Sequence, residues 1–529
     1  MDTIIGSLRA GIGLSGGRTV VEFHGGDGFT AEEILARSRK FAGAVAGLVP
    51  RGERVVIMLG NRPEFLWSFF GSVYGGIVPV PLNISLKGPM LEHVLKQVEP
   101  ALVIVERGTE QAMRDSLART GGAALLWRVD GPLTDDGDPA TFAELMAQSA
   151  DGTYAESAAA ELAMIMYTSG TTGPSKGIMY SHGMALEFAD FGQWLFGFGR
   201  DDVMFNCLPL FHGNALLLTM LGALRTGGKA VFAESFSAST YWQTVRDSGA
   251  TILSLLGSMF SILWNRPPSE LDRAHQARIA LTVPVPKEHF RDFEERFGLA
   301  LTSLYGLTDI GMPVGVPYPQ RAQPGQAGFV HPHWTCQIVD ESDCEVPDGT
   351  VGEMIFRPLR PNIMQLGYWR EPDATLNAWR NLWFHTGDLL RRDADGSFTF
   401  IDRSKDAIRR SGENISSFEV ELVLQDHPAV AEVAVYAVPS DLGEDEVMAA
   451  IVLEAGAECE PAAIVKYAEE YLPYFAVPRY VSVLDALPKT ATAKVKKDAL
   501  RATGVQAGVY DAGPRGRKHQ RGAAETSAL

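Results

Sequence analysis

Residues 167–176 combine the side chains that bind phosphate groups in proteins: they read Tyr-Thr-Ser-Gly-Thr-Thr-Gly-Pro-Ser-Lys. Hydroxyls, backbone N–H groups and the ammonium of Lys176 can together surround a polyphosphate. Gly170 and Gly173 let the backbone approach a ligand closely. The run is not a Walker A loop, because no glycine directly precedes Lys176 and no helix opens after it. The alternative interpretation is an ordinary hairpin loop rich in Ser, Thr and Gly.

Four later segments also carry side chains that packing alone does not explain. Residues 303–309, Ser-Leu-Tyr-Gly-Leu-Thr-Asp, can stack on a base, bind phosphate and hold a magnesium ion. Residues 383–388, Trp-Phe-His-Thr-Gly-Asp, place a carboxylate after a glycine turn, where it can accept both hydroxyls of a ribose. Residues 402–406 alternate in charge, and residues 488–494 set Lys494 near the end of the folded chain. Taken singly, each segment could be a strand end, a solvated turn or a surface loop.

The elements that must position these segments alternate between strands and helices. Thr30 and Glu33 form a capping-box signature before a helix over 34–48, and Pro63 begins a second helix with an apolar face. A buried element is expected over 208–224, where His212, Gly213 and Asn214 interrupt the apolar run. Alternating elements predict α/β layers with largely parallel sheets. Strand patterns cover 55–59, 77–82, 101–105, 228–232 and 251–256.

The pattern of expected secondary structure changes twice in the second half of the chain. Gly298 ends a predicted helix over 288–297, and residues 330–357 have the short strands and turns of a β-rich subdomain. After a charged stretch, a compact α/β pattern begins, so a domain boundary is expected near Lys405. From Gly504 onward the chain is Gly-rich and basic, which predicts disorder.

The bulk composition excludes several classes of protein. A chain of 529 residues is too long for one core, and a net charge of -17 argues against a nucleic-acid binder. The 4 cysteines show no CxxC pair, which disfavours both a zinc site and a disulfide framework. The N-terminus lacks a signal-peptide pattern. The sequence therefore predicts a cytoplasmic protein with no membrane span, and it leaves a homo-oligomer open.

In this order and at these separations, the five segments resemble the adenylate-forming superfamily. This superfamily includes acyl-CoA synthetases, aryl-CoA ligases, luciferases and the adenylation domains of peptide synthetases. The resemblance extends from about the first helix to Arg501. Within the superfamily the chain looks most similar to carnitine/crotonobetaine-CoA ligase-like acyl-CoA synthetases, on the basis of residues 266–269, 301–303 and 412–416.

The resemblance implies an α/β fold with two domains. Residues 1–404 would form a large N-terminal AMP-binding domain of layered α/β subdomains plus a β-rich subdomain. Residues 405–503 would form a small mobile C-terminal α+β lid, and 504–529 a disordered basic tail. It also implies an AMP-forming acid–thiol ligase that uses Mg²⁺, with ATP and coenzyme A as co-substrates. A carboxylate and ATP would give an acyl-adenylate and pyrophosphate, and the thiol of coenzyme A would then displace AMP.

The same resemblance assigns roles around the nucleotide. Tyr305 would stack on adenine, Thr308 would contact the α-phosphate and Asp309 would hold the magnesium ion. Asp388 would hold the ribose hydroxyls with help from Arg403. The β- and γ-phosphates would lie against Thr168, Ser169, Gly170, Thr171, Thr172, Gly173 and Lys176.

The remaining roles concern the lid, the thiol and the acyl group. Lys405 would be the hinge, and Lys494 would bridge the carboxylate and α-phosphate oxygens during adenylation. His212 would gate the acyl pocket or meet the carboxylate, unless it is a satisfied core histidine. Coenzyme A would contact Arg409, Ser411, Gly412 and Glu413. The acyl pocket would include Phe211, Gly213, Leu304 and residues 256–260.

The chain departs from the superfamily pattern at three places. Asp309 replaces the usual glutamate, although the shorter carboxylate can still coordinate magnesium, directly or through water. Ala493 replaces the usual glycine before the catalytic lysine. Residues 281–286, Leu-Thr-Val-Pro-Val-Pro, replace the usual Gly-Gly-Ala-Pro run at the adenine pocket.

Two other functions stay open at this stage. The protein could load a carrier protein in trans or form an amide, because neither partner would leave a trace in this sequence. It could also be a non-catalytic nucleotide-binding homologue, as the three departures would allow. Carnitine-like, alicyclic, aryl and short aliphatic acids all remain candidate substrates. Leu304, which stands where many long-chain or aromatic ligases carry glycine, favours a small or compact acid.

Overall fold

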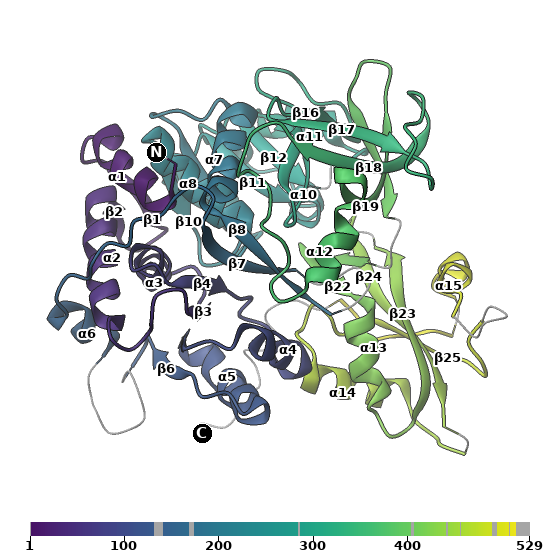
Figure 1. Cartoon of the computed structure of the whole chain (residues 1–529). Helices are drawn as coiled ribbons and strands as arrows, with labels where there is room; N and C mark the ends of the chain where they lie inside the picture. Colours follow the sequence, from purple (N-terminus) through teal and green to yellow (C-terminus); the bar gives the residue numbers. More distant parts are fainter. Residues whose placement is uncertain are drawn as a thin grey trace.

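The computed structural model describes residues 2–131, 141–168, 174–283, 286–403, 407–440, 443–454, 456–488, 495–506 and 508–514. Figure 1 shows a large body formed by the chain up to β20 (Phe398–Arg403) and a smaller one from β21 (Ala407–Arg410) onward. Both combine helices with sheets, so the predicted α/β fold with a large N-terminal part and a small C-terminal part is confirmed. The predicted hinge, Lys405, lies outside the described residues.

The first sheet has four parallel strands in the order β4-β3-β5-β6. Thr30 Oγ1 accepts from the Glu33 N–H and the Glu33 carboxylate accepts from the Thr30 N–H, which confirms the predicted capping box. Pro63 begins its helix as predicted, because proline in the first turn loses no helical hydrogen bond. The strands are β3 (Arg54–Met58), β4 (Val78–Pro81), β5 (Leu102–Val105) and β6 (Leu125–Arg128), and the helices are α2 (Ala31–Val45), α3 (Pro63–Tyr74), α4 (Gly88–Val98), α5 (Arg107–Thr120) and α6 (Phe142–Gln148).

The second sheet has seven strands in the order β13-β12-β11-β9-β10-β1-β2, all parallel to their neighbours apart from β2. The predicted buried element over 208–224 is the π-helix η1 (Asn214–Met220) followed by α8 (Leu221–Thr226). The strands are β1 (Thr19–Phe23), β2 (Gly28–Thr30), β9 (Val203–Asn206), β10 (Lys229–Phe232), β11 (Ile252–Leu256), β12 (Ile279–Val283) and β13 (Ala300–Thr302). The other helices are α1 (Ile4–Ser15), α7 (His182–Phe196), α9 (Tyr241–Ser248), α10 (Gly257–Trp264) and α11 (Phe290–Phe297).

The third sheet is antiparallel, with the order β14-β15-β16-β20-β19-β18-β17, and it confirms the predicted β-rich subdomain. A separate antiparallel hairpin of β7 (Leu162–Thr168) and β8 (Lys176–Ser181) carries the first motif on the loop that joins its strands. The other strands of the third sheet are β14 (Leu304–Leu307), β15 (Gly311–Gly315), β16 (Gln326–Val330), β17 (Trp334–Val339), β18 (Val351–Pro358) and β19 (Phe384–Arg392), and α12 (Pro372–Ala378) lies between β18 and β19 in the sequence.

The C-terminal part contains a four-stranded sheet, β23-β24-β25-β26, and the hairpin of β21 and β22 (Glu413–Ser416). The disorder predicted from Gly504 is wrong for part of that tail, because β26 (Tyr510–Asp511) pairs with β25 (Tyr480–Val483). Arg479 holds this strand through an ion pair with Asp511 at 3.0 Å. The other elements are β23 (Val430–Pro439), β24 (Asp445–Leu453), α13 (Ser417–Gln425), α14 (Pro461–Tyr471) and α15 (Lys497–Thr503).

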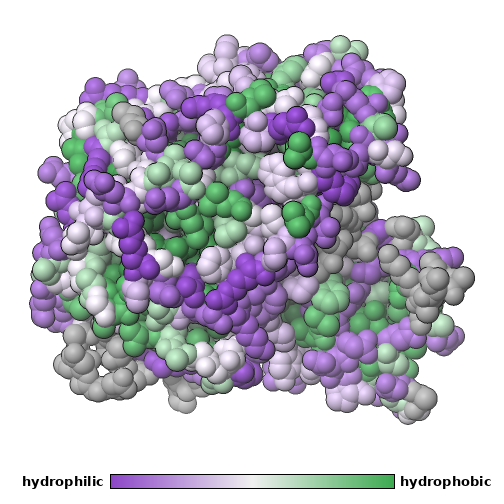
Figure 2. Space-filling view, in the orientation of Figure 1, coloured by the Kyte–Doolittle hydropathy of each residue, from purple (hydrophilic) through white to green (hydrophobic). Residues whose placement is uncertain are grey.

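Hydrophilic residues cover most of the face shown in Figure 2, and hydrophobic residues are visible mainly in the recesses between them. Among the helices of the described part of the chain, none is long and apolar enough to cross a bilayer.

Candidate functional site

A cavity of about 1540 Å³ lies where the sheets of the large part meet the β21–β22 hairpin of the small part. Residues from segments far apart in the sequence line it, which is the convergence that the motifs predict. The predicted site residues in its lining are Thr168, Phe211, His212, Gly213, Leu304, Thr308, Arg409, Ser411, Gly412 and Glu413.

The β7–β8 hairpin presents the first motif at one side of this cavity. Thr168 ends β7 directly opposite Lys176, the first residue of β8. The Lys176 ammonium lies 5.3 Å from the centre of the Tyr368 ring, within the range of a cation–π contact. The other predicted phosphate ligands, Ser169, Gly170, Thr171, Thr172 and Gly173, lie outside the described residues.

The third sheet brings the predicted nucleotide residues together. The Tyr305 hydroxyl donates to Asp388 Oδ2 at 2.9 Å, and both residues are buried. Asp388 pairs in register with Arg403 on the neighbouring strand. Two motifs separated by 83 residues in sequence thus form one cluster.

Glu353, which the sequence analysis did not single out, holds the turn that carries Asp388. Its Oε1 accepts from the Gly387 N–H at 2.8 Å, and its Oε2 lies 3.0 Å from His385 Nδ1. Gly387 has a φ of 70°, a conformation that favours glycine. Because a charged acceptor strengthens a hydrogen bond to a backbone N–H, Glu353 fixes the direction of the following carboxylate.

Two buried tyrosines anchor the Thr308–Asp309 segment. The Tyr368 hydroxyl donates to Asp309 Oδ1 at 2.5 Å, and the Tyr180 hydroxyl donates to the Thr308 carbonyl. Burial, reinforced by the Asp309 carboxylate, raises the pKa of both phenols above the usual value, so both remain donors at neutral pH. The oxygen donors of Thr308 and Asp309 are of the kind that Mg²⁺ prefers.

The tip of the β21–β22 hairpin enters the cavity beside His212. Glu413 Oε1 accepts from Asn83 Nδ2 at 2.7 Å and lies 3.1 Å from His212 Nε2. Gly412 has a φ of 79°, and a Cβ at this position would come within 2.4 Å of Leu256 Cδ1. A side chain here would therefore prevent the hairpin from docking.

A second contact joins the C-terminal part to the β7–β8 hairpin. Glu419, in the first turn of α13, accepts from the Ser175 N–H at 2.9 Å and from its hydroxyl at 2.6 Å. Burial raises the pKa of Glu419, while the two hydrogen bonds from Ser175 oppose that shift. Ser175 directly precedes Lys176, so the docked C-terminal part contacts the first motif as well as His212.

Sequence reasoning missed Asn83, Glu353 and Glu419. Their partners come from distant segments, and no local spacing signals such contacts. Conversely, Lys494 and Lys405 lie outside the described residues, so their predicted roles stay predictions.

The β7–β8 hairpin, the Thr308 segment and the docked C-terminal part line one cavity, and the Tyr305–Asp388 cluster lies on the third sheet, whose strand β14 ends just before Thr308, without lining that cavity. The chain belongs to the AMP-binding enzyme family, whose model matches residues 12–369. The model of the AMP-binding enzyme C-terminal domain matches residues 419–494.

The curated relatives include the crotonobetaine/carnitine–CoA ligases of Salmonella enteritidis PT4 and Salmonella typhi. Each is 28% identical to this chain over 505 residues, which are 92% of this chain and 97% of the relative.

Three solved structures are similar over 94% of this chain. The amide bond synthetase of Marinactinospora thermotolerans has a TM-score of 0.82 and 25% identity, with 99% of that chain covered. A double mutant of the o-succinylbenzoate CoA synthetase of Bacillus subtilis, bound to a product analogue, has a TM-score of 0.81 and 23% identity, with 98% covered. The ATP-bound MatB of Rhodopseudomonas palustris has a TM-score of 0.67 and 26% identity, with 98% covered.

Proposed function

We propose that this protein is an ATP-dependent carboxylate–CoA ligase of the AMP-forming, acid–thiol type. It activates a carboxylic acid as an acyl-adenylate with release of pyrophosphate, and it then transfers the acyl group to coenzyme A with release of AMP. The observation that carries this proposal is the docking of the Ser411–Glu413 tip beside His212, in a cavity that also reaches Thr168 and Thr308. One cavity is thus lined by the docked C-terminal part, by the proposed acyl site and by the proposed phosphate site.

In the first half-reaction the enzyme must bring together two anions that repel each other. The β7–β8 hairpin, with Lys176 at its end, holds the β- and γ-phosphates, and Thr308 contacts the α-phosphate. Tyr305 stacks on adenine, while Asp388, aimed by Glu353 and assisted by Arg403, accepts from the ribose hydroxyls. Asp309 would hold Mg²⁺, which supplies charge neutralisation at the phosphates. A carboxylate oxygen attacks the α-phosphorus and pyrophosphate leaves.

The second half-reaction corresponds to the docked arrangement. The thiolate sulfur of coenzyme A forms a bond to the acyl carbon, the bond from that carbon to the phosphate oxygen breaks, and AMP leaves with the electron pair. Ser411 and Gly412 approach the thiol arm, Glu413 fixes the His212 ring, and Arg409 meets the anionic nucleotide end.

The experiment that tests the function is pyrophosphate release with a panel of carboxylic acids, with and without coenzyme A. Acid-dependent release together with a thioester product supports the ligase. Release without thioester supports the second candidate, an adenylating enzyme that forms an amide or loads a carrier protein, which the likeness to an amide bond synthetase favours. The absence of acid-dependent release would leave a nucleotide-binding homologue. We also assign the enzyme to the cytoplasm, where coenzyme A and ATP are available.

Leu304 sets the depth of the acyl site, and we expect the Leu304→Gly variant to accept longer or bulkier acids than the wild-type enzyme. Leu304 is buried at the start of β14 and lines the cavity with Phe188 and Met259. Removing its side chain opens space beyond the reacting carboxylate. The measurement is kcat/KM for a homologous series of acids. We expect the acid with the highest kcat/KM to be longer by two or more carbons for the variant than for the wild-type enzyme.

The matched control is Leu304→Met, which keeps the volume and should keep the wild-type profile. An unchanged chain-length profile in Leu304→Gly would show that another residue limits the site.

A further inference from the structure

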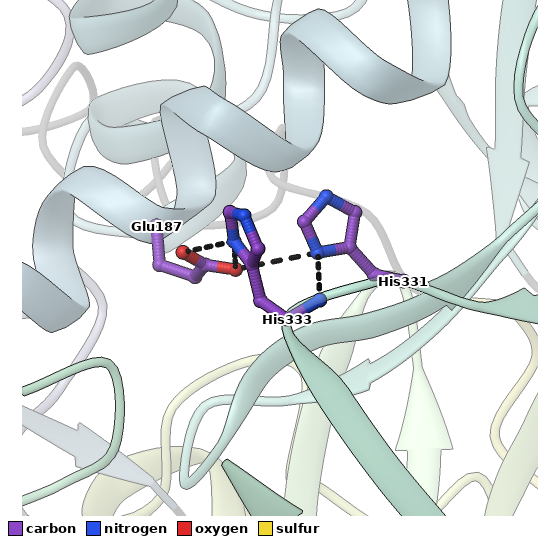
Figure 3. Close-up of side chains that lie close together, drawn as sticks. All are labelled: Glu187, His331 and His333. Carbon is purple, nitrogen blue, oxygen red and sulfur yellow. Dashed lines mark hydrogen bonds and ion pairs between the residues drawn. The ribbon is translucent and has the colours of Figure 1, made fainter. Parts of the chain in front are cut away.

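Three side chains of metal-ligand type converge on a point that the proposed reaction does not use (Figure 3). Glu187 comes from α7, and His331 and His333 come from the turn between β16 and β17. His333 Nδ1 lies 2.8 Å from Glu187 Oε1, and His331 Nδ1 lies 3.4 Å from the same oxygen. All three ligand atoms fall within 4.8 Å of one another. Ligands of a tetrahedral zinc ion are about 3.3 Å apart, given bonds of about 2.0–2.1 Å.

The carboxylate in this cluster is deeply buried. Glu187 is 5% exposed, so its carboxylate has lost most of its contact with water. Within the described residues, its ion-pair partners are the two imidazoles, and the Arg360 guanidinium, which contacts His333, acts on the carboxylate from farther away. A buried carboxylate needs a positive partner to offset its lost hydration. A divalent cation between these groups would provide more charge than neutral imidazoles can.

His331 already has the protonation state that a metal requires. Its Nδ1 accepts from the His333 backbone N–H at 3.3 Å, so this nitrogen carries a lone pair that faces the cluster. A long hydrogen bond of this kind is weak, and a metal–nitrogen bond can replace it.

His333 can bind a metal through Nδ1 only after its ring proton moves to the other ring nitrogen. Arg360 Nη1 lies 3.0 Å from His333 Nε2, so Nε2 accepts and the ring proton lies on Nδ1, where it faces Glu187. Metal binding at Nδ1 moves that proton to Nε2 and turns the guanidinium away. Arg360 is exposed, so its side chain can move into solvent.

We propose that Glu187, His331 and His333 form a binding site for a divalent cation of borderline softness, such as Zn²⁺. Two imidazoles and one carboxylate suit this class of ion, and the fourth position is left for water. The ion ties α7 to the β16–β17 turn, and thereby joins the second sheet's helices to the third sheet. Phe191 on α7 packs against the His331 ring at 5.7 Å, and Phe188 lines the cavity, so the ion stiffens the helix behind the acyl side.

The test titrates Zn²⁺ into metal-free protein that carries no histidine tag, with binding measured by calorimetry in the absence of ATP. We expect one equivalent to bind and the melting temperature to rise. Glu187→Gln and His333→Ala should each weaken binding at least about 100-fold, since each removes one of three protein ligands. His289→Ala, which breaks a surface His–Asp contact of 3.5 Å, is the matched control and should bind normally.

Co²⁺ provides a readout that does not depend on the variants folding. The Trp194 ring lies 4.9 Å from the His331 ring, so Co²⁺ bound at this site should quench Trp194 fluorescence and show visible absorption of a low-coordinate ion. The quenching should disappear in Trp194→Phe. Absence of a stoichiometric Zn²⁺ site, or binding that survives in Glu187→Gln and His333→Ala, would overturn the proposal and leave a hydrogen-bonded Glu187–His333–Arg360 cluster. Because neither measurement uses ATP, acid or coenzyme A, the result is independent of the proposed reaction.

Discussion

Acyl-adenylate formation by the Lys494→Ala variant is expected to fall at least about 100-fold, while thioester formation from a supplied acyl-adenylate stays close to wild type. Negative charge builds on the carboxylate and α-phosphate oxygens as the first bond forms, and the proposed bridging ammonium neutralises it there. The thiol step does not build this charge, and the docked lid presents Ser411, Gly412 and Glu413 to the cavity instead. The two half-reactions are measured separately, by acid-dependent pyrophosphate release and by single-turnover thioester formation.

The matched control is Lys496→Ala, which removes the same charge two residues along the chain. Lys496 is exposed, so this variant should retain both half-reactions. Equal losses of both half-reactions in Lys494→Ala would contradict the assignment of this lysine to adenylation alone.

Features encoded by neighbouring residues could be predicted from the sequence. The Thr30–Glu33 capping box and Gly298 at the end of α11 satisfy backbone groups within one turn, and the structure shows both. The antiparallel pairing of β7 with β8 agrees with the hairpin that was the alternative interpretation of residues 167–176. The Tyr305 and Asp388 motifs could also be singled out, because each motif carries its residues within a few positions, and their roles in nucleotide binding stay predictions.

The missed features depend on contacts between distant segments. Asn83 meets Glu413 across 330 positions, and Glu419 meets Ser175 across 244. Neither Asn83 nor Glu419 differs by type or spacing from an ordinary surface residue. Asp511 was assigned to a disordered tail because local composition there is Gly-rich, whereas its side chain accepts from Arg479, which directly precedes β25. Packing between distant parts of the chain determines these contacts, and the local amino-acid composition does not indicate them.

The contact between the lid and the phosphate hairpin gives the second large expected effect. Glu419→Ala should slow thioester formation from a supplied acyl-adenylate by about 10-fold or more, while adenylation stays within about twofold of wild type. The substitution removes two hydrogen bonds and leaves the buried Ser175 N–H without its acceptor, which costs about 1–3 kcal/mol. That cost falls on the docked arrangement alone, because the contact exists only when the lid lies on the hairpin. The population of the docked arrangement should therefore fall, and the rate of thioester formation, which needs this arrangement, should fall with it.

Two further variants separate docking from simple loss of stability. Glu419→Gln keeps an acceptor oxygen for Ser175 and should lose less than Glu419→Ala. Glu421→Ala, on the same helix, breaks contacts that stay within the C-terminal part, with Lys497 at 2.7 Å and the Val435 N–H at 2.7 Å. It should lower the melting temperature without changing the ratio of the two half-reactions. If Glu419→Ala instead reduced both half-reactions equally, the Ser175 contact would be a packing feature. A selective loss of thioester formation would show that the Ser175 contact stabilises the docked lid. Glu419→Ala and Lys494→Ala would then have opposite effects, since each variant would disable the half-reaction that the other retains.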